Sequence, residues 1–541
     1  MHTNKLHNRR SFLKQSLLAT GALLWLPSCE DKNDIKHIKG SIVGANSKSG
    51  HIARDLKSRP SPTHTEQVDY LIVGGGIAGL TALRHLKNAG ITSCKLLEMD
   101  NHTGGNSHSG SNKISQYPWG AHYLPVPDIR NKEILDFLQS CGVITEYKDG
   151  LPVYNEYHIC HDPEERLFIN GQWQEGIVPE FGVPAADKEQ IRKFFALMAS
   201  MKTAVGADGK DAFTIPLKNS TEDAKYRDLD KISFAAYLKQ NNFTSPPLLW
   251  YLEYCCKDDY GTRLDNTSAW AGIHYFAARK GKGANAKDST VLTWPEGNAF
   301  LATHLRKQCD ETTIALQHAA VNIKPTASGA DVLVNDVNKG TFYQITAKKM
   351  IVCTPQFVTK HLIDLGKLRY SMYDSFYYTP WLIANLTVRD LPTAKGLSLC
   401  WDNIIYGSES VGYVNANNQD VTRSSKAVLT CYKPYAYTTP QAGRMKLQKS
   451  DYKTLLKEVI DELDYAHQGI AQFIEQADLW IWGHGMIAPL PGFIWGASRL
   501  IANSPVDNKI FFAHSDLSGI SIFEEAFYQG LDAAKNALAA S

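Results

Sequence analysis

The chain has little cysteine and no excess of either charge. Its 541 residues include ten cysteines, with no CxxC pair and no Cys/His cluster at the spacing of a zinc site. This scarcity argues against a disulfide framework and against a bound metal, although a single disulfide stays open. Lys and Arg number 57 against 55 Asp and Glu, for a net charge of +2. The charge balance therefore gives no reason to expect nucleic acid or an acidic membrane surface as a partner.

Internal repeats, low-complexity tracts and long apolar runs are also lacking. A chain of this length is too long for a single hydrophobic core, so two or three domains are expected. Hydrophobic residues make up 43% and charged residues 21%, as in ordinary globular proteins. Eleven Trp, 25 Tyr and 20 Phe supply material for the core and for the walls of a ligand pocket.

The N-terminus has the charge-then-apolar order of an export signal. Arg9 and Arg10 precede Phe12-Leu13-Lys14, and an apolar run too short to span a membrane follows at residues 17–26. This pattern resembles the twin-arginine signal, which implies export of an already folded protein to the periplasm. The alternative is a chance Arg pair before an ordinary secretion signal.

A second processing signal follows the apolar run. Leu26-Pro27-Ser28-Cys29 resembles a lipoprotein cleavage box, in which Pro27 is an unusual residue. A lipidated Cys29 would tether the protein to a membrane, whereas a plain cleavage site would leave this cysteine incidental. The signal is predicted to occupy residues 1–29. The polar residues 30–66 are predicted to form a flexible tether with little structure of its own.

A glycine-rich turn follows the β-branched run Val68–Val73. The pattern G-x-G-x-x-G stands between this predicted buried strand and a predicted helix over residues 80–89. Its glycines permit the tight turn, the approach of a pyrophosphate to the backbone, and close packing of helix on strand. The first turn of the helix would direct free N–H groups at the phosphates. The predicted dinucleotide-binding residues here are Gly74, Gly76, Ile77, Ala78 and Gly79.

An acidic residue ends the next predicted strand. Cys94–Leu97 is apolar, and Glu98 follows it, 24 residues after Gly74. A carboxylate at this place can accept hydrogen bonds from the ribose hydroxyls of a dinucleotide. A lone glycine motif is weak, but the strand, helix, second strand and terminal acid together favour a dinucleotide site over a structural glycine turn.

The residues after Glu98 indicate which dinucleotide is the cofactor. Residues 98–106 run from the acid through polar residues to a second glycine pair, and here the chain resembles the flavin amine oxidase superfamily, which also includes desaturases and protoporphyrinogen oxidases. Asn106 stands where the family usually has Arg. Residues 118–123 resemble the family segment that wraps the flavin. The resemblance implies FAD as the cofactor, with contacts from Met99, Gly104, Gly105, Asn106, Trp119, Gly120, Ala121 and His122.

Two later stretches resemble the rest of the same site. Residues 294–298 look like the family's Pro-x-Gly-Gly entry to a helix, and Val321 inherits a backbone contact with the adenine. Residues 509–530 resemble the family's final strand, acid and flavin-contacting helix, so the resemblance implies that Asp516 and Ile522 lie at the cofactor.

The fold class predicted from these stretches is α/β, a Rossmann-like FAD-binding domain with an interleaved α+β substrate domain. Residues 67–125, 285–365 and 475–541 are expected to form the discontinuous FAD-binding domain. Residues 126–284 and 366–474 are expected to form the substrate or cap domain over the flavin.

The residues expected at the flavin depart from those of amine oxidases. Those enzymes flank the flavin with two aromatic side chains, and the matching positions here are Gly485 and Ile522. The segment also lacks the Cys that tethers the flavin in monoamine oxidases, so non-covalent FAD is expected. His484 is the predicted catalytic residue, because a histidine can move protons near neutral pH. The alternative is a histidine that only binds backbone.

These features predict an exported FAD-dependent oxidoreductase, an oxidase or dehydrogenase that transfers hydride from a small or medium-sized organic substrate to FAD. One alternative is a desaturase-like flavoenzyme that acts on an apolar molecule. A second alternative is a protein with a flavin fold that binds a ligand without turnover.

Overall fold

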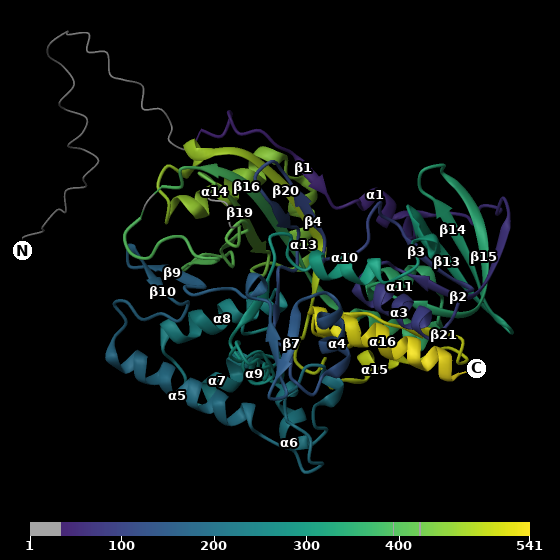
Figure 1. Ribbon diagram of the computed structural model, residues 1–541, viewed down its shortest axis with the longest axis horizontal. Helices are drawn as coiled ribbons and strands as arrows, with labels where there is room; N and C mark the ends of the chain where they lie inside the picture. The colour runs from purple at the N-terminus through teal and green to yellow at the C-terminus, as the bar shows by residue number, and fades with distance from the viewer. Residues whose placement is uncertain (1–33, 393, 421–423, 541) are drawn as a thin grey trace, which may run out of the picture.

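The computed structural model describes residues 34–392, 394–420 and 424–540. The predicted twin-arginine signal and Cys29 lie outside these residues. The described part contains two large β-sheets and a group of helices (Figure 1). This arrangement confirms the predicted α/β class.

The first sheet has seven strands and carries the glycine turn. The central strand β2 (Thr65–Val73) pairs in parallel with β3 (Cys94–Glu98) and with β15 (Thr341–Val352). Leu71 and Val73 face one hydrophobic core while Ile72 faces another, as the period of two in a strand requires. The remaining strands are β12 (Ile314–Leu316), β13 (His318–Thr326), β14 (Gly329–Asp336) and β21 (Ile510–Phe512).

Two helices from opposite ends of the chain cover one face of this sheet. They are α3 (Ile77–Asn88), which follows the glycine turn, and α16 (Phe523–Ala539). They meet closely because Gly530 leaves no side chain against the carbonyl of Ala78; a Cβ there would lie 2.1 Å from that oxygen. The C-terminal helix thus reaches the same edge of the sheet as the glycine turn.

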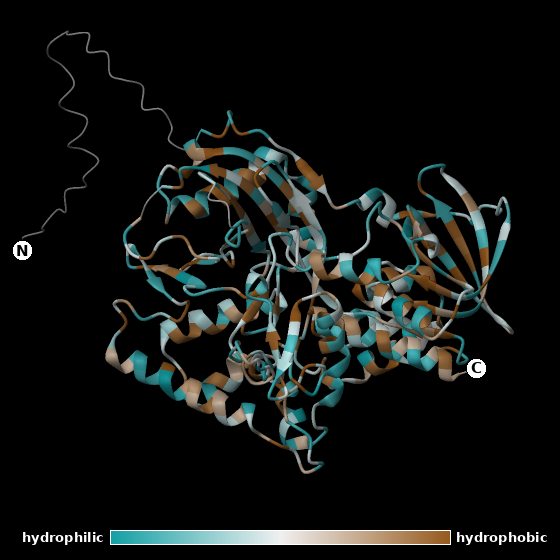
Figure 2. Ribbon diagram, in the orientation of Figure 1, coloured by the Kyte–Doolittle hydropathy of each residue, from teal (hydrophilic) through white to brown (hydrophobic). Residues whose placement is uncertain are grey.

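The second sheet has eight strands in the order β1-β20-β16-β19-β18-β17-β9-β10. Helices α13 (Pro440–Lys449) and α14 (Tyr452–Asp464) contact it from one side, and α5 (Ala185–Lys202), α8 (Pro246–Tyr260) and α9 (Ala269–Ala277) form a group near its other side (Figure 1). In Figure 2 hydrophobic and hydrophilic residues both occur along outer helices such as α5, as expected of helices with one buried face. The strands are β1 (Ile42–Gly44), β9 (Glu165–Ile169), β10 (Gln172–Glu175), β16 (Tyr377–Arg389), β17 (Asp402–Ile405), β18 (Tyr413–Asn415), β19 (Lys426–Pro434) and β20 (Ile474–Ala488).

Two boundaries differ from those expected from the sequence. The sequence predicts β20 in the cofactor domain, but the strand pairs with β1 and β16 inside the eight-stranded sheet. Helix α4 (Lys132–Ser140) was assigned to the cap, but its Phe137 packs against Phe523 and Phe527 of α16. Both differences arise because strand pairing and helix docking depend on distant partners that local patterns do not reveal.

The expectation of a flexible tether with little structure over residues 30–66 is wrong for residues 42–55. Residues 42–44 form β1, and α1 (Ser47–Gly50) and α2 (Ile52–Asp55) follow. Backbone hydrogen bonds hold the segment: the Ala477 amide donates to the Lys39 carbonyl at 2.8 Å and the Leu479 amide donates to the Ser41 carbonyl at 2.9 Å. An edge strand held by its backbone needs no apolar alternation, so its composition resembled that of a linker.

The nine cysteines between residues 34 and 540 are all buried and free. Within the same described residues, no helix combines the length and apolar character required to cross a membrane.

Candidate active site

The glycine turn opens into a large cavity of about 1030 Å³. A Cβ on Gly76 would meet nothing within 4 Å, so the backbone at this point is bare toward the cavity. Gly79 does not line the cavity; a Cβ there would lie 1.9 Å from the carbonyl oxygen of Gly74. Gly79 therefore permits helix–strand packing, while Gly74, Gly76, Ile77 and Ala78 form the wall.

The first turn of α3 presents an uncapped N-terminus to this cavity. Gly76 occupies the N-cap position without a side-chain hydrogen bond, and the first turn holds no acidic residue. The free N–H groups and the positive end of the helix dipole favour an anion at this place. This arrangement suits the pyrophosphate of a dinucleotide.

Glu98 lines the same cavity at the end of β3. Its Oε2 accepts a hydrogen bond from the Gly75 amide at 2.8 Å, and its Oε1 accepts one from the Asp100 amide at 2.9 Å. Burial raises the pKa of Glu98 to about 7, although these hydrogen bonds favour the ionised form. The carboxyl group is thus fixed in place beside the glycine turn. The predicted residues Met99, Gly104, Gly105, Asn106, Ala121 and Val321 line the cavity as well.

Asp516 also lies at the cavity, but its carboxylate is occupied by the protein. Its Oδ2 accepts hydrogen bonds from the Tyr378 hydroxyl at 2.5 Å and the Gln356 amide at 2.9 Å, and Oδ1 lies 3.0 Å from Nδ1 of His514. Burial alone would raise the pKa of Asp516, but the interactions with His514, Tyr378 and Gln356 outweigh it and the pKa is lowered. The carboxylate therefore joins the C-terminal segment to β16 and α11 (Gln356–Leu362).

His484 lines the large cavity from β20. Its ring stacks on Phe357 at 4.1 Å between centroids and lies edge-on to Tyr378. Burial, followed by the charges of Arg444 and Lys360, lowers the pKa of His484 to about 3, so the imidazole is neutral near pH 7. His484 is not among the residues that line the second cavity described next.

A smaller cavity of about 150 Å³ adjoins the large one. Asn106 donates a hydrogen bond from Nδ2 to the Gly485 carbonyl at 2.7 Å and so joins two sides of the common wall. Ile522, the second predicted flavin-flanking position, also lies in this wall. Eight residues line both cavities: Asn106, Ala121, Trp482, Gly485, Met486, Ser521, Ile522 and Phe523.

An aromatic side chain from a neighbouring strand fills the space beside Gly485. A Cβ on Gly485 would lie 2.6 Å from Cδ1 of Trp381, and a Cβ on Gly261 would lie 2.9 Å from Nε1 of the same indole. Trp381 belongs to β16, where it pairs with Trp482 of β20. The small cavity therefore has an aromatic wall even though residue 485 is glycine. The other aromatic residues around it are His122, Tyr123, His274, Tyr275, Tyr432, Trp482 and Phe523.

Three carboxyl groups line the small cavity. Asp259 forms an ion pair with Arg279 at 3.0 Å, and Arg279 also donates to the Tyr123 hydroxyl. Asp258 and Glu524 form no ion pair with any residue of the described chain. Burial raises the pKa of Asp258 to about 7, with a further contribution from the charge of Asp259, and burial also raises that of Glu524 to about 7.

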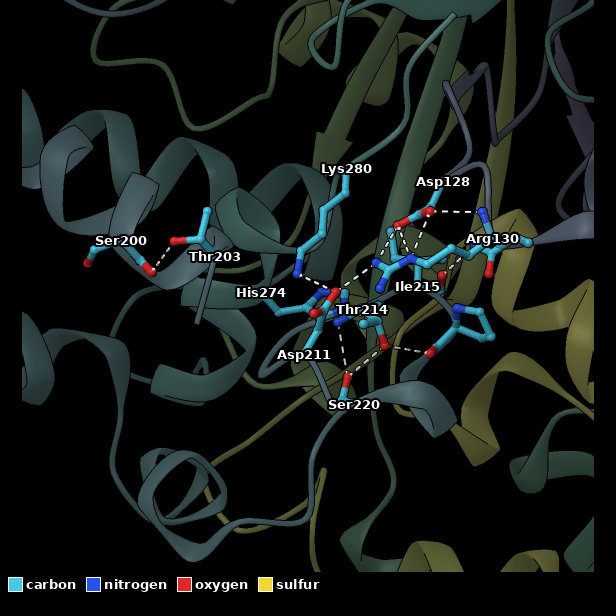
Figure 3. A network of polar contacts seen from close by, with 12 residues as sticks. Asp128, Arg130, Ser200, Thr203, Asp211, Thr214, Ile215, Ser220, His274 and Lys280 are labelled. Atoms are coloured by element: carbon cyan, nitrogen blue, oxygen red, sulfur yellow. Dashed lines mark hydrogen bonds and ion pairs between the residues drawn. The ribbon is translucent and has the colours of Figure 1, made fainter. Parts of the chain in front are cut away.

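A polar network supports the far end of the small cavity (Figure 3). The Asp211 carboxylate binds Arg130 at 2.6 Å and Lys280 at 2.9 Å, and His274, which lines the cavity, lies 2.9 Å from the Thr214 carbonyl through Nε2. Lys280 lines neither cavity, because its ammonium group is held by the ion pair with Asp211. The described residues contain no group of three or more His, Cys, Asp or Glu side chains suited to hold a metal.

One predicted cofactor residue besides Gly79 lines neither cavity. Trp119 is only 3% exposed, and its carbonyl accepts a hydrogen bond from Nε1 of Trp482 at 2.6 Å, so it supports the wall from behind. Gly120 and His122 line the small cavity instead of the large one. Trp381 and Asp258 were not predicted from the sequence. A local signal for Asp258 is the pair of acids at 258 and 259, at the end of a helix rich in apolar and aromatic residues.

Comparisons with known proteins agree with this arrangement. Residues 72–141 match the family model described as an NAD(P)-binding Rossmann-like domain. No curated protein matches the chain in sequence.

Solved structures match over nearly the whole chain. Wild-type putrescine oxidase bound to putrescine is 15% identical, with a TM-score of 0.63 over 88% of this chain and 100% of that one. Cyclohexylamine oxidase from Brevibacterium oxydans IH-35A is 13% identical, with a TM-score of 0.60 over 87% and 98%. A fatty acid isomerase from P. acnes that produces CLA is 15% identical, with a TM-score of 0.57 over 86% and 97%. The chain therefore has the fold of these solved structures.

Proposed function

We propose that this protein is a flavoenzyme that binds FAD non-covalently in the large cavity and oxidises a small organic amine in the small cavity. The observation that carries the proposal is the shared wall. A cavity lined by carboxyl groups and aromatic rings lies directly against a cavity built for a dinucleotide.

The residues of the large cavity fit FAD. A volume of about 1030 Å³ is at the upper end of the range of about 300–1,000 Å³ for small-molecule and cofactor sites. The bare backbone at Gly76 and the uncapped α3 would hold the pyrophosphate, and Glu98 would accept hydrogen bonds from the ribose. Bound FAD would supply the hydride acceptor, which no side chain of the protein can provide.

The small cavity suits a cation with an apolar body. A buried carboxylate without a partner is costly, so Asp258 and Glu524 favour either a proton or a positively charged ligand. Aromatic faces, including that of Trp381, attract cations by about 0.5–2 kcal/mol. An alkylammonium or arylalkylammonium ion satisfies both requirements.

Carboxyl groups at this place can also move a proton. A protonated amine must lose a proton before its carbon can give up hydride. Asp258 and Glu524 have pKa values of about 7, which suits a group that accepts a proton near neutral pH. We assign proton acceptance to these carboxylates, whereas His484 faces only the larger cavity. A catalytic role for His484 stays a prediction.

The test is anaerobic reduction of the purified flavoprotein by amines. Butylamine, benzylamine, cyclohexylamine and putrescine are mixed with the protein without oxygen, and cyclohexanol serves as the uncharged control. We expect at least one amine to bleach the flavin absorbance, air to restore it, and cyclohexanol to have no effect. A yellow protein that no amine bleaches would refute amine oxidation, and a protein without flavin that takes up no FAD would refute the whole proposal.

A desaturase-like reaction on an apolar molecule has less support. It would leave two buried carboxyl groups without a partner in the substrate site. The likeness to a fatty acid isomerase is one of fold.

Export is proposed separately and rests on residues 9–14 and 26–29 of the sequence. We propose transport by the twin-arginine route and lipidation of Cys29. Replacing Arg9 and Arg10 by Lys should retain the protein in the cytoplasm of a producing cell. Replacing Cys29 by Ala should abolish labelling by palmitate, and unchanged labelling would refute lipidation at this residue.

A further inference from the structure

The segment that precedes the Rossmann strand reaches the cofactor cavity. We propose that residues 42–54, called the strap below, are part of the FAD site and enclose the adenosine end of the cofactor. This inference rests on the proposed binding of FAD. Ten residues of the strap line the large cavity: Ile42, Gly44, Ala45, Asn46, Ser47, Ser49, Gly50, His51, Ala53 and Arg54.

The strap joins both halves of the protein. Its β1 pairs in parallel with β20 of the eight-stranded sheet, with Ile42 opposite Leu479 and Gly44 opposite Trp480. Its α2 contacts α11 and β13 of the cofactor domain. Figure 1 shows α1 between the two sheets, and residues of α1 line the large cavity. The strap thus crosses from one domain to the other over the cavity.

Its position identifies the part of the cofactor that it would contact. Nδ2 of Asn46 donates a hydrogen bond to Oδ1 of Asp100 at 3.2 Å, and a Cβ on Gly50 would lie 3.7 Å from Cε of Met99. Both partners directly follow Glu98, the expected ribose ligand. Strand β13, which α2 contacts, carries Val321. The strap therefore lies where the ribose and adenine are expected.

The strap offers groups that suit an adenosine. Asn46, Ser47, Ser49 and His51 line the cavity within six residues of one another, so hydroxyl, amide and imidazole groups are available to ribose hydroxyls and ring nitrogens. Asn46 also caps α1 through a hydrogen bond from the Ser49 amide to Oδ1 at 3.2 Å. The polar residues are thereby held by the local fold.

Two glycines allow the strap and the residues just before it to lie directly against β20. A Cβ on Gly44 would lie 2.3 Å from Cδ2 of the Trp480 ring, and a Cβ on Gly40 would lie 1.6 Å from the Ala477 carbonyl oxygen. Any larger residue would force the strap away from β20. Ile38, which is buried in the core beneath this sheet, anchors the chain just before these glycines.

Docking of the strap and binding of FAD should therefore favour each other. FAD gains contacts only when the strap is docked, and the docked strap gains contacts only when FAD is bound, so the coupling is reciprocal. The strap should slow the escape of FAD, and FAD should protect the strap from proteolysis.

The test uses the full FAD-loaded protein and the variant Gly44→Leu. Release of FAD after dilution is followed by the rise in flavin fluorescence, and trypsin cleavage at Lys48 or Arg54 is followed by mass spectrometry. We expect release to be faster by about 5- to 150-fold, the usual range of coupling between sites. Cleavage should be faster both in the variant and in wild-type protein stripped of FAD. Ser41→Leu is the matched control, because residue 41 is exposed, lies outside the strap and lines neither cavity, and it should behave as wild type.

The possible results distinguish a failure of the inference about the strap from a failure of the proposed function. Faster cleavage of Gly44→Leu with unchanged FAD release would overturn the inference. If Gly44→Leu resists trypsin as well as the wild type does, the double variant Gly40→Val with Gly44→Leu is tested next. Resistance of the strap to trypsin in the double variant as well would overturn the proposed docking of the strap on β20. A wild-type protein that neither carries nor takes up FAD would instead refute the proposed cofactor.

Discussion

The two adjoining cavities of this protein are built in different ways. In the large cavity, the bare backbone of the glycine turn at residues 74–79 supplies one wall, and side chains of α11, α13 and β20 supply others. The small cavity is lined by bulky aromatic and acidic side chains from helices α8 and α9, strands β16, β19 and β20, and the start of α16. The difference teaches that a dinucleotide is bound by local backbone geometry, whereas the amine proposed here is bound by side chains that the fold brings together.

The largest effect is expected from Gly79→Val, behind the wall of the large cavity. The new Cβ would lie 1.9 Å from the Gly74 carbonyl, so helix and strand must separate. We expect a loss of stability above about 3 kcal/mol, the upper end for overpacking, together with loss of FAD. Thermal unfolding and flavin absorbance measure both effects. Gly76→Ala is the comparison: its Cβ meets no protein atom, so it should weaken FAD binding without lowering the stability of the FAD-free protein.

Trp381→Ala tests the small cavity in the same way. Truncating this buried indole should lower the free energy of unfolding by about 3–5 kcal/mol and raise KM for amines. Denaturant unfolding and steady-state kinetics measure the two effects. The double variant Trp381→Gly with Gly485→Tyr moves the aromatic ring to the other strand. Recovery of amine binding would support the aromatic wall, and a double variant that binds amine no better than Trp381→Ala would count against it.

Asp258→Asn and Glu524→Gln test the carboxyl groups. A hydrogen bond to a charged group contributes about 1.5–3 kcal/mol, so each change should weaken amine binding by about 10- to 150-fold while FAD stays bound. Affinity is measured by calorimetry with tert-butylamine, whose ammonium form keeps its N–H donors but has no α-hydrogen to give up as hydride. Equal affinity in wild type and both variants would show that the cation site is elsewhere.

The pH dependence of stability and of amine affinity tests the same two carboxyl groups. Burial raises the pKa of Asp258 and Glu524 to about 7, above the usual value of about 4. Their contribution to stability is therefore fully present below about pH 4 and is lost as the pH rises through about 7. Without amine, wild type should lose more stability between pH 5 and pH 8 than Asp258→Asn, as thermal unfolding will show. Amine affinity should rise over this range, and parallel curves for the two proteins would contradict the raised pKa.

The smallest effect is expected from His484→Ala. Because the neutral imidazole faces only the large cavity, its loss should weaken FAD binding by a few fold. The rate at which amine reduces the flavin should change by a smaller factor. Stopped-flow absorbance and FAD titration separate the two. Slower reduction with unchanged FAD affinity would instead establish the catalytic role predicted from the sequence.

Sequence patterns were informative wherever the structure depends on neighbouring residues. The strand over residues 68–73, the glycine turn and the acid at position 98 were predicted because each constrains the backbone locally. The strap was mistaken for a linker because its structure depends on hydrogen bonds to β20, more than 400 residues away. Trp381 was missed because nothing near it in the chain shows that Gly485 and Gly261 leave space for its ring.

The sequence by itself therefore determined the α/β class, the glycine turn and the acid that ends the next strand, because glycine conformation, apolar periodicity and chain spacing are properties of consecutive residues. Only the tertiary structure decided which side chains surround the small cavity, that Asp258 and Glu524 have no ion-pair partner among the described residues, and that residues 42–54 close over the cofactor site. These features depend on strand register and helix docking, which bring together residues from across the chain and exclude water from their charges.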